Sequence, residues 1–217
     1  MTAIVTGAAR GIGKAVADRL AQTHEVIRVD LAEGPDVLVA DVTRPEDRAR
    51  IVEAAGEVDV LVNNAGITKD ARIVKMTEDQ FLAVIRVNLE AAYELTRALT
   101  FAEGANVVSL ASRAYLGNFG QFNYSASKGG LVGMTRALAL ELAPRVRVNA
   151  IAPSLTASEM TLAMPEKVLS KMIASIPMGR MGEPEEIAGT VAALASKDMA
   201  YVTGQVVVAC GGRSLAP

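Results

Sequence analysis

A glycine-rich turn near the amino terminus constrains the fold of this chain more than any other feature. Thr2–Thr6 is a short apolar run typical of a strand, and Lys14–Ala21 has the apolar spacing that predicts a helix. In the turn between them, Gly7 allows a sharp bend, Gly11 lets the backbone approach a phosphate, and Gly13 permits close packing of helix on strand. Because a helix start also offers free N–H groups, the segment predicts a phosphate-binding strand–turn–helix unit. Its Gly-x-x-x-Gly-x-Gly spacing differs from the general G-x-G-x-x-G pattern, so taken alone it could be only a tight connection.

Strand-like runs recur along the whole chain and alternate with helical patterns. The runs are Thr2–Thr6, Glu25–Asp30, Val37–Ala40, Val58–Asn63, Asn106–Ala111, Val146–Ile151 and Gln205–Val208. Such alternation predicts an α/β fold: a Rossmann-like, doubly wound parallel sheet of about seven strands with helices on both faces. With 217 residues, 51% of them hydrophobic, and no internal repeat or linker, we expect residues 1–217 to form one domain.

An acidic residue at the end of the second run indicates which dinucleotide the turn would bind. Asp30 lies 17 residues after Gly13. A carboxylate at that place accepts hydrogen bonds from an adenosine ribose and repels the 2′-phosphate of NADP. We therefore expect NAD(H) to be favoured, with NADP(H) as the alternative. In that alternative Asp30 only caps a turn, and Arg10 or Arg28 neutralises a phosphate.

The segment Tyr124-Ser125-Ala126-Ser127-Lys128 carries a candidate acid/base pair. On a helix, residues four apart share a face, so the phenol of Tyr124 and the ammonium of Lys128 lie together. A free tyrosine titrates near pH ~10, and a fixed cation favours the phenolate. Lowering the pKa by about 3 units needs roughly 4 kcal/mol, more than one solvated ion pair supplies but attainable in a cleft that holds a second positive charge, for which the rest of the sequence suggests an oxidised nicotinamide. An isolated Tyr-x-x-x-Lys would be better read as a surface pair, but this one is not isolated.

Further motifs occur in the order in which a known family shows them. They are Thr6-Gly7-x-x-x-Gly11-x-Gly13, Asp41-Val42, Asn63-Asn64-Ala65-Gly66, Val87-Asn88-Leu89, Ser112, Tyr124-x-x-x-Lys128, and Pro153 after Val146–Ile151. With these motifs the chain resembles the short-chain dehydrogenase/reductase family from Thr2 to about Gly212. The resemblance implies an oxidoreductase that transfers a hydride between a nicotinamide and a carbonyl carbon.

The resemblance also implies roles for the matching residues. Ser112 would hydrogen-bond the substrate oxygen and Tyr124 would exchange the proton. Lys128 would lower the tyrosine pKa and hold the nicotinamide ribose, while Asn88 would anchor a water leading to solvent. The implied cofactor contacts are Gly7, Arg10, Gly11, Ile12, Gly13, Asp30, Asp41, Val42, Asn64, Ala65, Gly66, Tyr124, Lys128, Pro153 and Ser158. The structural alternatives are that Asn88 bonds within its helix, Ser112 ends a strand, and Lys128 is a solvated helix residue.

Three positions depart from the family pattern. Ser112 precedes Tyr124 by 12 residues, one fewer than in many members, so the intervening loop is expected to be shorter. Ser154 follows Pro153 where many relatives have glycine, and a β-carbon there is unfavourable if the backbone needs positive φ. Ser158 replaces the usual threonine but keeps a hydroxyl. Ser109 is the weaker substitute for Ser112, because it lies inside the apolar strand pattern.

The substrate is indicated by resemblance to one branch of the family. Residues 64–70, 118–124 and 178–180 resemble the 3-oxoacyl-[acyl-carrier-protein] reductases, which implies reduction of a 3-oxoacyl thioester in fatty acid metabolism. The rival is an NAD-dependent secondary-alcohol or 3-hydroxyacyl dehydrogenase working oxidatively, and a further alternative is a dinucleotide-binding module without turnover. Residues 158–175 are either a substrate lid or ordinary packing. Arg113 and Arg180 either steer a phosphopantetheine carrier or are surface charges.

Composition excludes several other classes of function. The formal charge of −2 and the absence of a basic stripe argue against nucleic acid. One cysteine, Cys210, and one histidine, His24, give no disulfide and no metal cluster, and Cys210 is expected to be a buried small residue. The first strand-like run begins at residue 2 and no apolar stretch is long enough to span a membrane, so we expect a cytoplasmic protein. The resemblance implies a homotetramer formed through helices at 78–102 and 121–143 together with the C-terminal strand. The alternative is that the apolar pattern of Ala137, Leu138, Leu140 and Leu142 is wholly intramolecular core.

Overall fold

Seven parallel strands form one sheet in the order β3-β2-β1-β4-β5-β6-β7. The computed structural model describes residues 1–215, apart from the side chains of Glu159 and Met160. The strands are β1 (Thr2–Thr6), β2 (Glu25–Asp30), β3 (Val37–Val39), β4 (Glu57–Asn63), β5 (Thr100–Leu110), β6 (Val146–Pro153) and β7 (Val206–Ala209). The helices are α1 (Gly11–Leu20), α2 (Pro45–Ala55), α3 (Glu78–Ile85), α4 (Ala91–Ala98), α5 (Phe122–Leu142), α6 (Glu159–Leu162), α7 (Glu166–Ala174) and α8 (Pro184–Ala195). The predicted doubly wound, Rossmann-like fold is confirmed.

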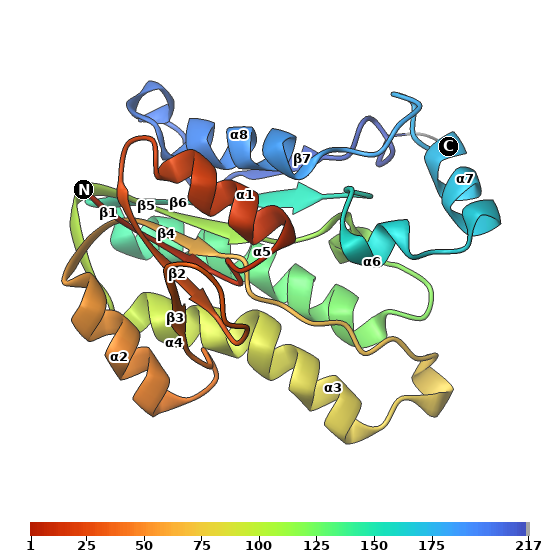
Figure 1. The fold of residues 1–217 in the computed structure, drawn as a ribbon, viewed down its shortest axis with the longest axis horizontal. Coiled ribbons are helices and arrows are strands. Elements are labelled where there is room, and N and C mark those ends of the chain that lie inside the picture. The colour runs from red at the N-terminus through yellow and green to blue at the C-terminus, as the bar shows by residue number, and fades with distance from the viewer. Residues whose placement is uncertain (216–217) are drawn as a thin grey trace.

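Helices cover both faces of the sheet, as Figure 1 shows. One hydrophobic cluster joins α1 and α8 to the sheet and includes Val16, Val5 and Val191, all fully buried. The other lies under α2, α4 and α5 and includes Ile51 and Leu95. Because both faces are buried, Val60, Leu61 and Val62 of β4 are apolar in succession rather than in alternation.

The glycine-rich turn forms the predicted strand–turn–helix unit, and α1 begins earlier than expected, at Gly11. Gly7 and Gly11 have positive φ, at 66° and 56°. A β-carbon on Gly13 would lie only 1.9 Å from the carbonyl oxygen of Gly7. Only glycine fits there, since real β-carbons do not approach a backbone oxygen so closely.

The prediction of one long helix at 78–102 is wrong in two respects. It is interrupted by one turn of π-helix (Arg86–Glu90) between α3 and α4, and it ends at Ala98. Leu99 is already extended, and the β-branched Thr100 and the aromatic Phe101 pair with Glu57 and Val58 of β4. Strand pairing therefore overrides the helical pattern at these residues.

The remaining boundaries lie close to the predicted ones. The helix α5 spans all but the two end residues of the expected 121–143 segment. In contrast, β5 begins six residues before the predicted Asn106. The segment 158–175 contains the two short helices α6 and α7, which lie at the end of the molecule near the C-terminus (Figure 1).

Candidate active site

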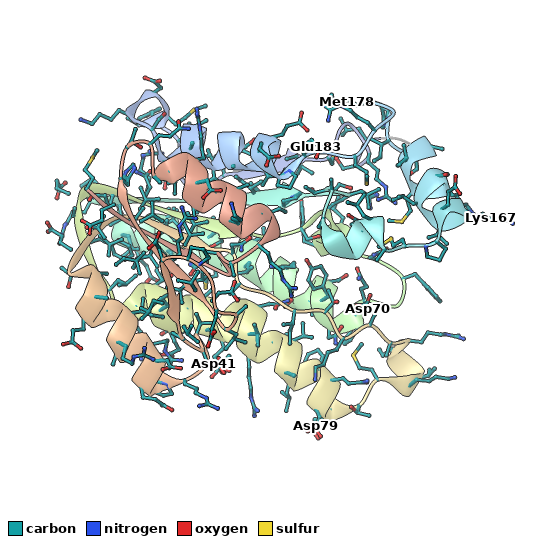
Figure 2. The ribbon with its side chains drawn as sticks, in the orientation of Figure 1. Asp41, Asp70, Asp79, Lys167, Met178 and Glu183 are labelled. Atoms are coloured by element: carbon teal, nitrogen blue, oxygen red, sulfur yellow. The ribbon has the colours of Figure 1, made fainter. Side chains whose placement is uncertain are left out.

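All strands run parallel, so their carboxyl ends meet at one edge of the sheet. This edge collects the turns that follow β1, β4 and β5, together with Asp30 at the end of β2 and Pro153 at the end of β6. Asp70 and Met178 both lie toward the end of the molecule that carries α6 and α7, whereas Asp41 lies on the side of β3 and α2 (Figure 2). The predicted cofactor and catalytic residues thus line one edge.

Hydrogen bonds tie the turn after β1 to the turn after β4. The side-chain amide of Asn64 donates to the carbonyl oxygens of Thr6 and Gly7, at 2.9 and 3.0 Å. The Thr6 hydroxyl in turn accepts from the backbone N–H groups of Asn64 and Ala65, both at 3.0 Å. Sequence reasoning missed Thr6 as a positioning residue, although it stands directly before Gly7.

The start of α1 is built to accept an anion. Arg10 precedes the helix and makes no side-chain cap, and the first turn holds no acidic residue. A β-carbon built on Gly11 would meet nothing within 4 Å, so the backbone there is open. Uncapped N–H groups at the positive end of a helix dipole suit a phosphate.

Asp30 is held in place by the backbone. Its carboxylate accepts hydrogen bonds from the N–H groups of Ala9, at 2.9 Å, and Ala32, at 3.1 Å. Arg28, the alternative phosphate ligand, instead forms an ion pair of 2.9 Å with Asp18. Asp30 therefore sits beside the glycine-rich turn, where it was expected.

Asp41 and Val42 follow β3 and form a turn of their own. Asp41 Oδ1 accepts from the backbone N–H of Thr43, at 2.9 Å, and from its hydroxyl, at 2.7 Å. The carbonyl oxygen of Val42 accepts from the Arg48 guanidinium, at 2.9 Å. These bonds fix the turn beside the predicted adenine position.

Tyr124 and Lys128 lie on one face of α5, as their spacing predicted. The Lys128 ammonium is 5.6 Å from the centre of the Tyr124 ring. Lys128 is only 4% exposed, and its ammonium donates to the carbonyl oxygen of Leu110 at 2.6 Å. Burial lowers the pKa of Lys128 to about 8. The solvated-residue alternative for this lysine is therefore wrong.

The pKa of Tyr124 shifts against the direction that was expected. Burial raises the pKa of the phenol, the Ser112 hydroxyl lowers it by hydrogen bonding, and the negative charge of Asp70 raises it. Lys128 is not among the groups that shift the pKa of Tyr124 in the protein alone.

Ser112 and Asn88 converge on this pair from two other elements. Ser112 ends the loop after β5, and its hydroxyl accepts from the backbone N–H of Ala114 at 3.2 Å, which caps a short 3-10 helix. Asn88 lies in the π-helical turn. Its amide pairs with both backbone groups of Ile67, at 2.8 and 3.0 Å, and donates to the Ser127 hydroxyl at 3.1 Å. A π-helical turn is frequent at functional sites because it re-aims one side chain.

Gly66 and Asn123 complete the surroundings of the pair. A β-carbon on Gly66 would lie 3.3 Å from the Asn88 side-chain oxygen and 3.5 Å from the Lys128 ammonium. Asn123 is fully buried, and its amide donates to the carbonyl oxygens of Lys69, at 2.9 Å, and Gln80, at 3.1 Å. Its side-chain oxygen accepts from the backbone N–H of Tyr124. Asn123 was missed by sequence reasoning, although its position directly before the tyrosine is a signal.

Comparison with known proteins decides the family. A family model described as enoyl-(acyl carrier protein) reductase matches residues 7–214. The chain is 41% identical to the 3-oxoacyl-[acyl-carrier-protein] reductase FabG of Thermotoga maritima, over 96% of both proteins. It is 40% identical to an acetoacetyl-CoA reductase of Shinella zoogloeoides, over 97% of both. The chain belongs to the short-chain dehydrogenase/reductase family.

A solved short-chain dehydrogenase/reductase agrees in fold as well. The glucose/ribitol dehydrogenase family member from Brucella melitensis is 31% identical and superimposes with a TM-score of 0.91, covering 98% of this chain and 96% of that one. The protein is thus an oxidoreductase of this family, whose members use a nicotinamide dinucleotide. The predicted resemblance is confirmed.

The structure gives a different outcome for each position that departs from the family pattern. Among the described non-glycine residues only Asp36 has positive φ, at 56°, so Ser154 has no left-handed strain and that concern is wrong. The Ser158 hydroxyl lies 3.1 Å from that of Thr161, at the start of α6. Ser109 is 1% exposed and lies in β5, which leaves it inside the sheet.

Two further side chains differ from expectation or choose between alternatives. Cys210 was expected to be buried, but it is partly exposed and its sulfur lies 3.2 Å from the Ser214 hydroxyl. Arg180 forms two hydrogen bonds with the Glu186 carboxylate, at 2.7 and 2.8 Å, which favours the surface-charge alternative.

Among the described side chains, no cluster of His, Cys, Asp and Glu is arranged to hold a metal ion. No helix in the described part of the chain combines the length and apolarity needed to cross a membrane.

Proposed function

We propose that this oxidoreductase reduces a 3-oxoacyl thioester to the 3-hydroxyacyl thioester. The observation that carries the proposal is the convergence of Ser112, Tyr124 and Lys128 at the carboxyl edge of the sheet, where the Lys128 ammonium lies 5.6 Å from the centre of the Tyr124 ring and the Ser112 hydroxyl acts on the pKa of the phenol. The substrate class is supported by relatives named as a 3-oxoacyl-[acyl-carrier-protein] reductase and an acetoacetyl-CoA reductase. The substrate would be carried by acyl carrier protein or by coenzyme A.

The described residues fit a dinucleotide. The open backbone at Gly11 and the uncapped start of α1 would hold the pyrophosphate, and Asp30 would hold the adenosine ribose. The other proposed contacts are Gly7, Arg10, Ile12, Gly13, Asp41, Val42, Asn64, Ala65, Gly66, Tyr124, Lys128, Pro153 and Ser158. When bound, the nicotinamide supplies the hydride. Because the Asp30 carboxylate would repel a 2′-phosphate, we propose NAD(H) as the preferred form.

The proton is delivered by the chain itself. The Ser112 hydroxyl would donate a hydrogen bond to the substrate carbonyl oxygen, and Tyr124 would give its proton to the oxygen as it becomes an alkoxide. A raised pKa keeps the phenol protonated at neutral pH, which is the state a proton donor needs. Lys128 would stabilise the phenolate that remains and bind the nicotinamide ribose. Asn88 would position the water that returns a proton from solvent.

The first test is a pair of initial rates with acetoacetyl-CoA, one with NADH and one with NADPH. Turnover with NADH preferred supports both the reaction and the role of Asp30. Preference for NADPH keeps the reaction and contradicts the ribose assignment. No turnover with either cofactor contradicts the proposed substrate class.

Two alternatives give different outcomes in assays of the same protein. An oxidative secondary-alcohol or 3-hydroxyacyl dehydrogenase, favoured by Asp30, would oxidise 3-hydroxybutyryl-CoA or a simple alcohol with NAD faster than it reduces the ketone. A non-catalytic module would bind NADH without turning over any carbonyl compound. We also propose that the protein forms a homotetramer, since the apolar side chains of Leu140 on α5 and Tyr93 on α4 are 83% and 44% exposed. Its proposed location is the cytoplasm.

A further inference from the structure

Arg113, the residue after Ser112, is half-buried and has one guanidinium nitrogen without a hydrogen-bond partner. Its side-chain Nε atom is inaccessible to solvent and makes no hydrogen bond. No carboxylate among the described residues forms an ion pair with it. Burying an unpaired donor of a charged group is costly, so such a group commonly meets a ligand. Of the two arginines considered at this edge, Arg180 is satisfied by Glu186 and Arg113 is not.

A second arginine, Arg213, lies on the neighbouring part of the same edge. It follows β7 in a fixed turn, in which its backbone N–H donates to the carbonyl oxygen of Cys210 at 3.1 Å. Gly212 has a φ of 87°, and a β-carbon on it would lie 3.0 Å from Pro177, so the turn packs on the chain after α7. Arg213 likewise has no ion pair within residues 1–215. Partial burial lowers the pKa of Arg213, and the positive charge of Arg113 lowers it further.

The sheet brings these two arginines to either side of one strand. β6 lies between β5 and β7, so the segments that follow β5 and β7 and carry Arg113 and Arg213 leave the sheet on either side of the carboxyl end of β6. Neighbouring strands are about 4.8 Å apart, which puts the ends of β5 and β7 roughly 10 Å apart, within the joint reach of two arginine side chains. Ser154, the first residue after β6, has a buried hydroxyl that makes no hydrogen bond. Three polar groups without partners therefore occur together at the ends of three adjacent strands.

We propose that Arg113 and Arg213 form a subsite for a carboxylate carried on the substrate's own carbon chain. This inference rests on the proposed function and narrows its substrate class to 3-oxoacyl thioesters with an acidic acyl group. Two guanidinium groups around one carboxylate satisfy both charges, and the planar fork of arginine matches a carboxylate in two contacts. The Ser154 hydroxyl is available as a further donor.

The position of the subsite favours a carboxylate on the acyl chain over the phosphates of the dinucleotide and of a phosphopantetheine arm. The glycine-rich turn follows β1, which is four strands away from β7 in the sheet. The pyrophosphate and any 2′-phosphate of the dinucleotide would therefore lie elsewhere. In a phosphopantetheine arm, two amide units and their linkers separate the thioester from the phosphate. Arg113 adjoins Ser112, whose hydroxyl would hold the reacting carbonyl, so we place the anion only a few bonds from that carbonyl.

The test compares two six-carbon substrates that differ at one end. 3-Oxohexanedioyl-CoA ends in a carboxylate, and 3-oxohexanoyl-CoA ends in a methyl group. We expect the wild type to prefer the acidic substrate in kcat/KM. Arg113→Gln and Arg213→Gln should each reduce that preference by roughly 10- to 100-fold, which is the range for a hydrogen bond to a charged group. The loss should be seen as a higher KM for the acidic substrate. Arg19→Gln, which changes an exposed arginine on α1, should leave the preference unchanged.

The outcomes separate this inference from the proposed function. If the wild type reduces 3-oxohexanoyl-CoA but does not prefer the acidic substrate, the subsite is refuted and the reaction stands. The subsite is also refuted if the arginine variants lose kcat/KM equally on both substrates. A variant whose sedimentation coefficient changes while its substrate preference does not would refute it as well. If neither thioester is reduced, the proposed function fails and this inference fails with it. Should Arg113→Gln not fold, Arg113→Lys replaces it and should lose part of the preference, because lysine keeps the charge without the planar fork.

Discussion

At the scale of single residues, the candidate site is assembled from side chains whose hydrogen bonds are made to backbone. Asn88 holds both polar groups of Ile67, Asn64 holds the carbonyl oxygens of the glycine-rich turn, and Lys128 donates to Leu110. These residue types could be predicted because their spacing is specific. Their partners could not, since Ile67 and Leu110 contribute only backbone atoms, and no side-chain pattern marks such a contact.

Tyr124→Phe should abolish most turnover while leaving the cofactor bound. The variant lacks the proton donor, so kcat should fall by about 100-fold or more. The ring remains in place, so the Kd for NADH should change little. Stopped-flow reduction and a fluorescence titration with NADH measure the two quantities. Turnover near that of the wild type would overturn the proposed mechanism.

Asp30→Ala should reduce the preference for NADH over NADPH. The change removes the carboxylate that would bind the ribose and repel a 2′-phosphate. It also removes an acceptor for the N–H groups of Ala9 and Ala32, so the free energy of unfolding should fall by about 1–3 kcal/mol. The ratio of the two kcat/KM values is the readout, with Glu53→Ala, an exposed position on α2, as the control. An unchanged ratio would mean that the ribose binds elsewhere.

The buried Lys128 makes stability depend on pH in a defined window. Its pKa falls from 10.5 to about 8 on folding, so the unfolded chain binds more protons between these values. The free energy of unfolding should therefore rise with pH from about 8 to 10, by up to about 3 kcal/mol. Urea denaturation at pH 7, 8, 9 and 10 measures it. Lys128→Met should flatten this rise, and an equally steep rise in the variant would assign it to another group.

At the scale of elements, the helix α5 and the π-helical turn pack closely because residue 130 is a glycine and has no side chain. A β-carbon on Gly130 would lie 2.5 Å from a methyl carbon of Leu89, next to Asn88. This close approach brings Asn88 against Ser127 and the loop at Ile67. The turn itself could not be predicted, because residues 86–90 have an ordinary helical composition and the extra residue in the turn is a product of packing.

Gly130→Ala should destabilise the protein relative to Gly129→Ala. Both changes raise helix propensity equally, by about 1 kcal/mol. A β-carbon on Gly129 meets nothing within 4 Å, whereas one on Gly130 collides with Leu89. We expect the free energy of unfolding of Gly130→Ala to be lower by about 1–3 kcal/mol. Equal stability of the two variants would show that Leu89 moves aside without cost.

The sequence predicted the strands better than it predicted where one helix ended. Each of the seven strands was expected within two residues except β5, whose first part follows a helical pattern and pairs with β4 across a register shift. Turn chemistry explains the success elsewhere, since glycine, proline and aspartate punctuate the runs. Long-range pairing explains the failure, because residues 57 and 100 are distant in the chain.

At the scale of the whole molecule, two of the exposed apolar residues share one face of the sheet. Leu140 on α5 and Tyr93 on α4 lie on helices of the same face of the sheet, the face of the second hydrophobic cluster. Large exposed apolar side chains on a soluble surface commonly mark contacts between proteins. The expectation of a tetramer is consistent with this distribution and stays a prediction.

Leu140→Glu should shift the protein to smaller assemblies. The substitution puts a charge where a partner helix would bury leucine, while the isolated fold loses little because Leu140 is 83% exposed. Sedimentation velocity over a range of concentrations measures the assembly, and circular dichroism checks the fold. Ala49→Glu on α2 is the control and should leave the assembly unchanged. A wild-type protein that sediments as a monomer would contradict the prediction at once.

The bonds between the turns after β1 and β4 have a consequence for how such a protein can diverge. Since Thr6 and Asn64 each bind the backbone of the other turn, neither turn can change length without breaking the other. We therefore expect insertions and deletions to be tolerated better in the opposite half of the same edge, around residues 113–121 and 158–175. New substrates could be acquired there by altering loops, while the half proposed to meet the dinucleotide would be inherited as one unit.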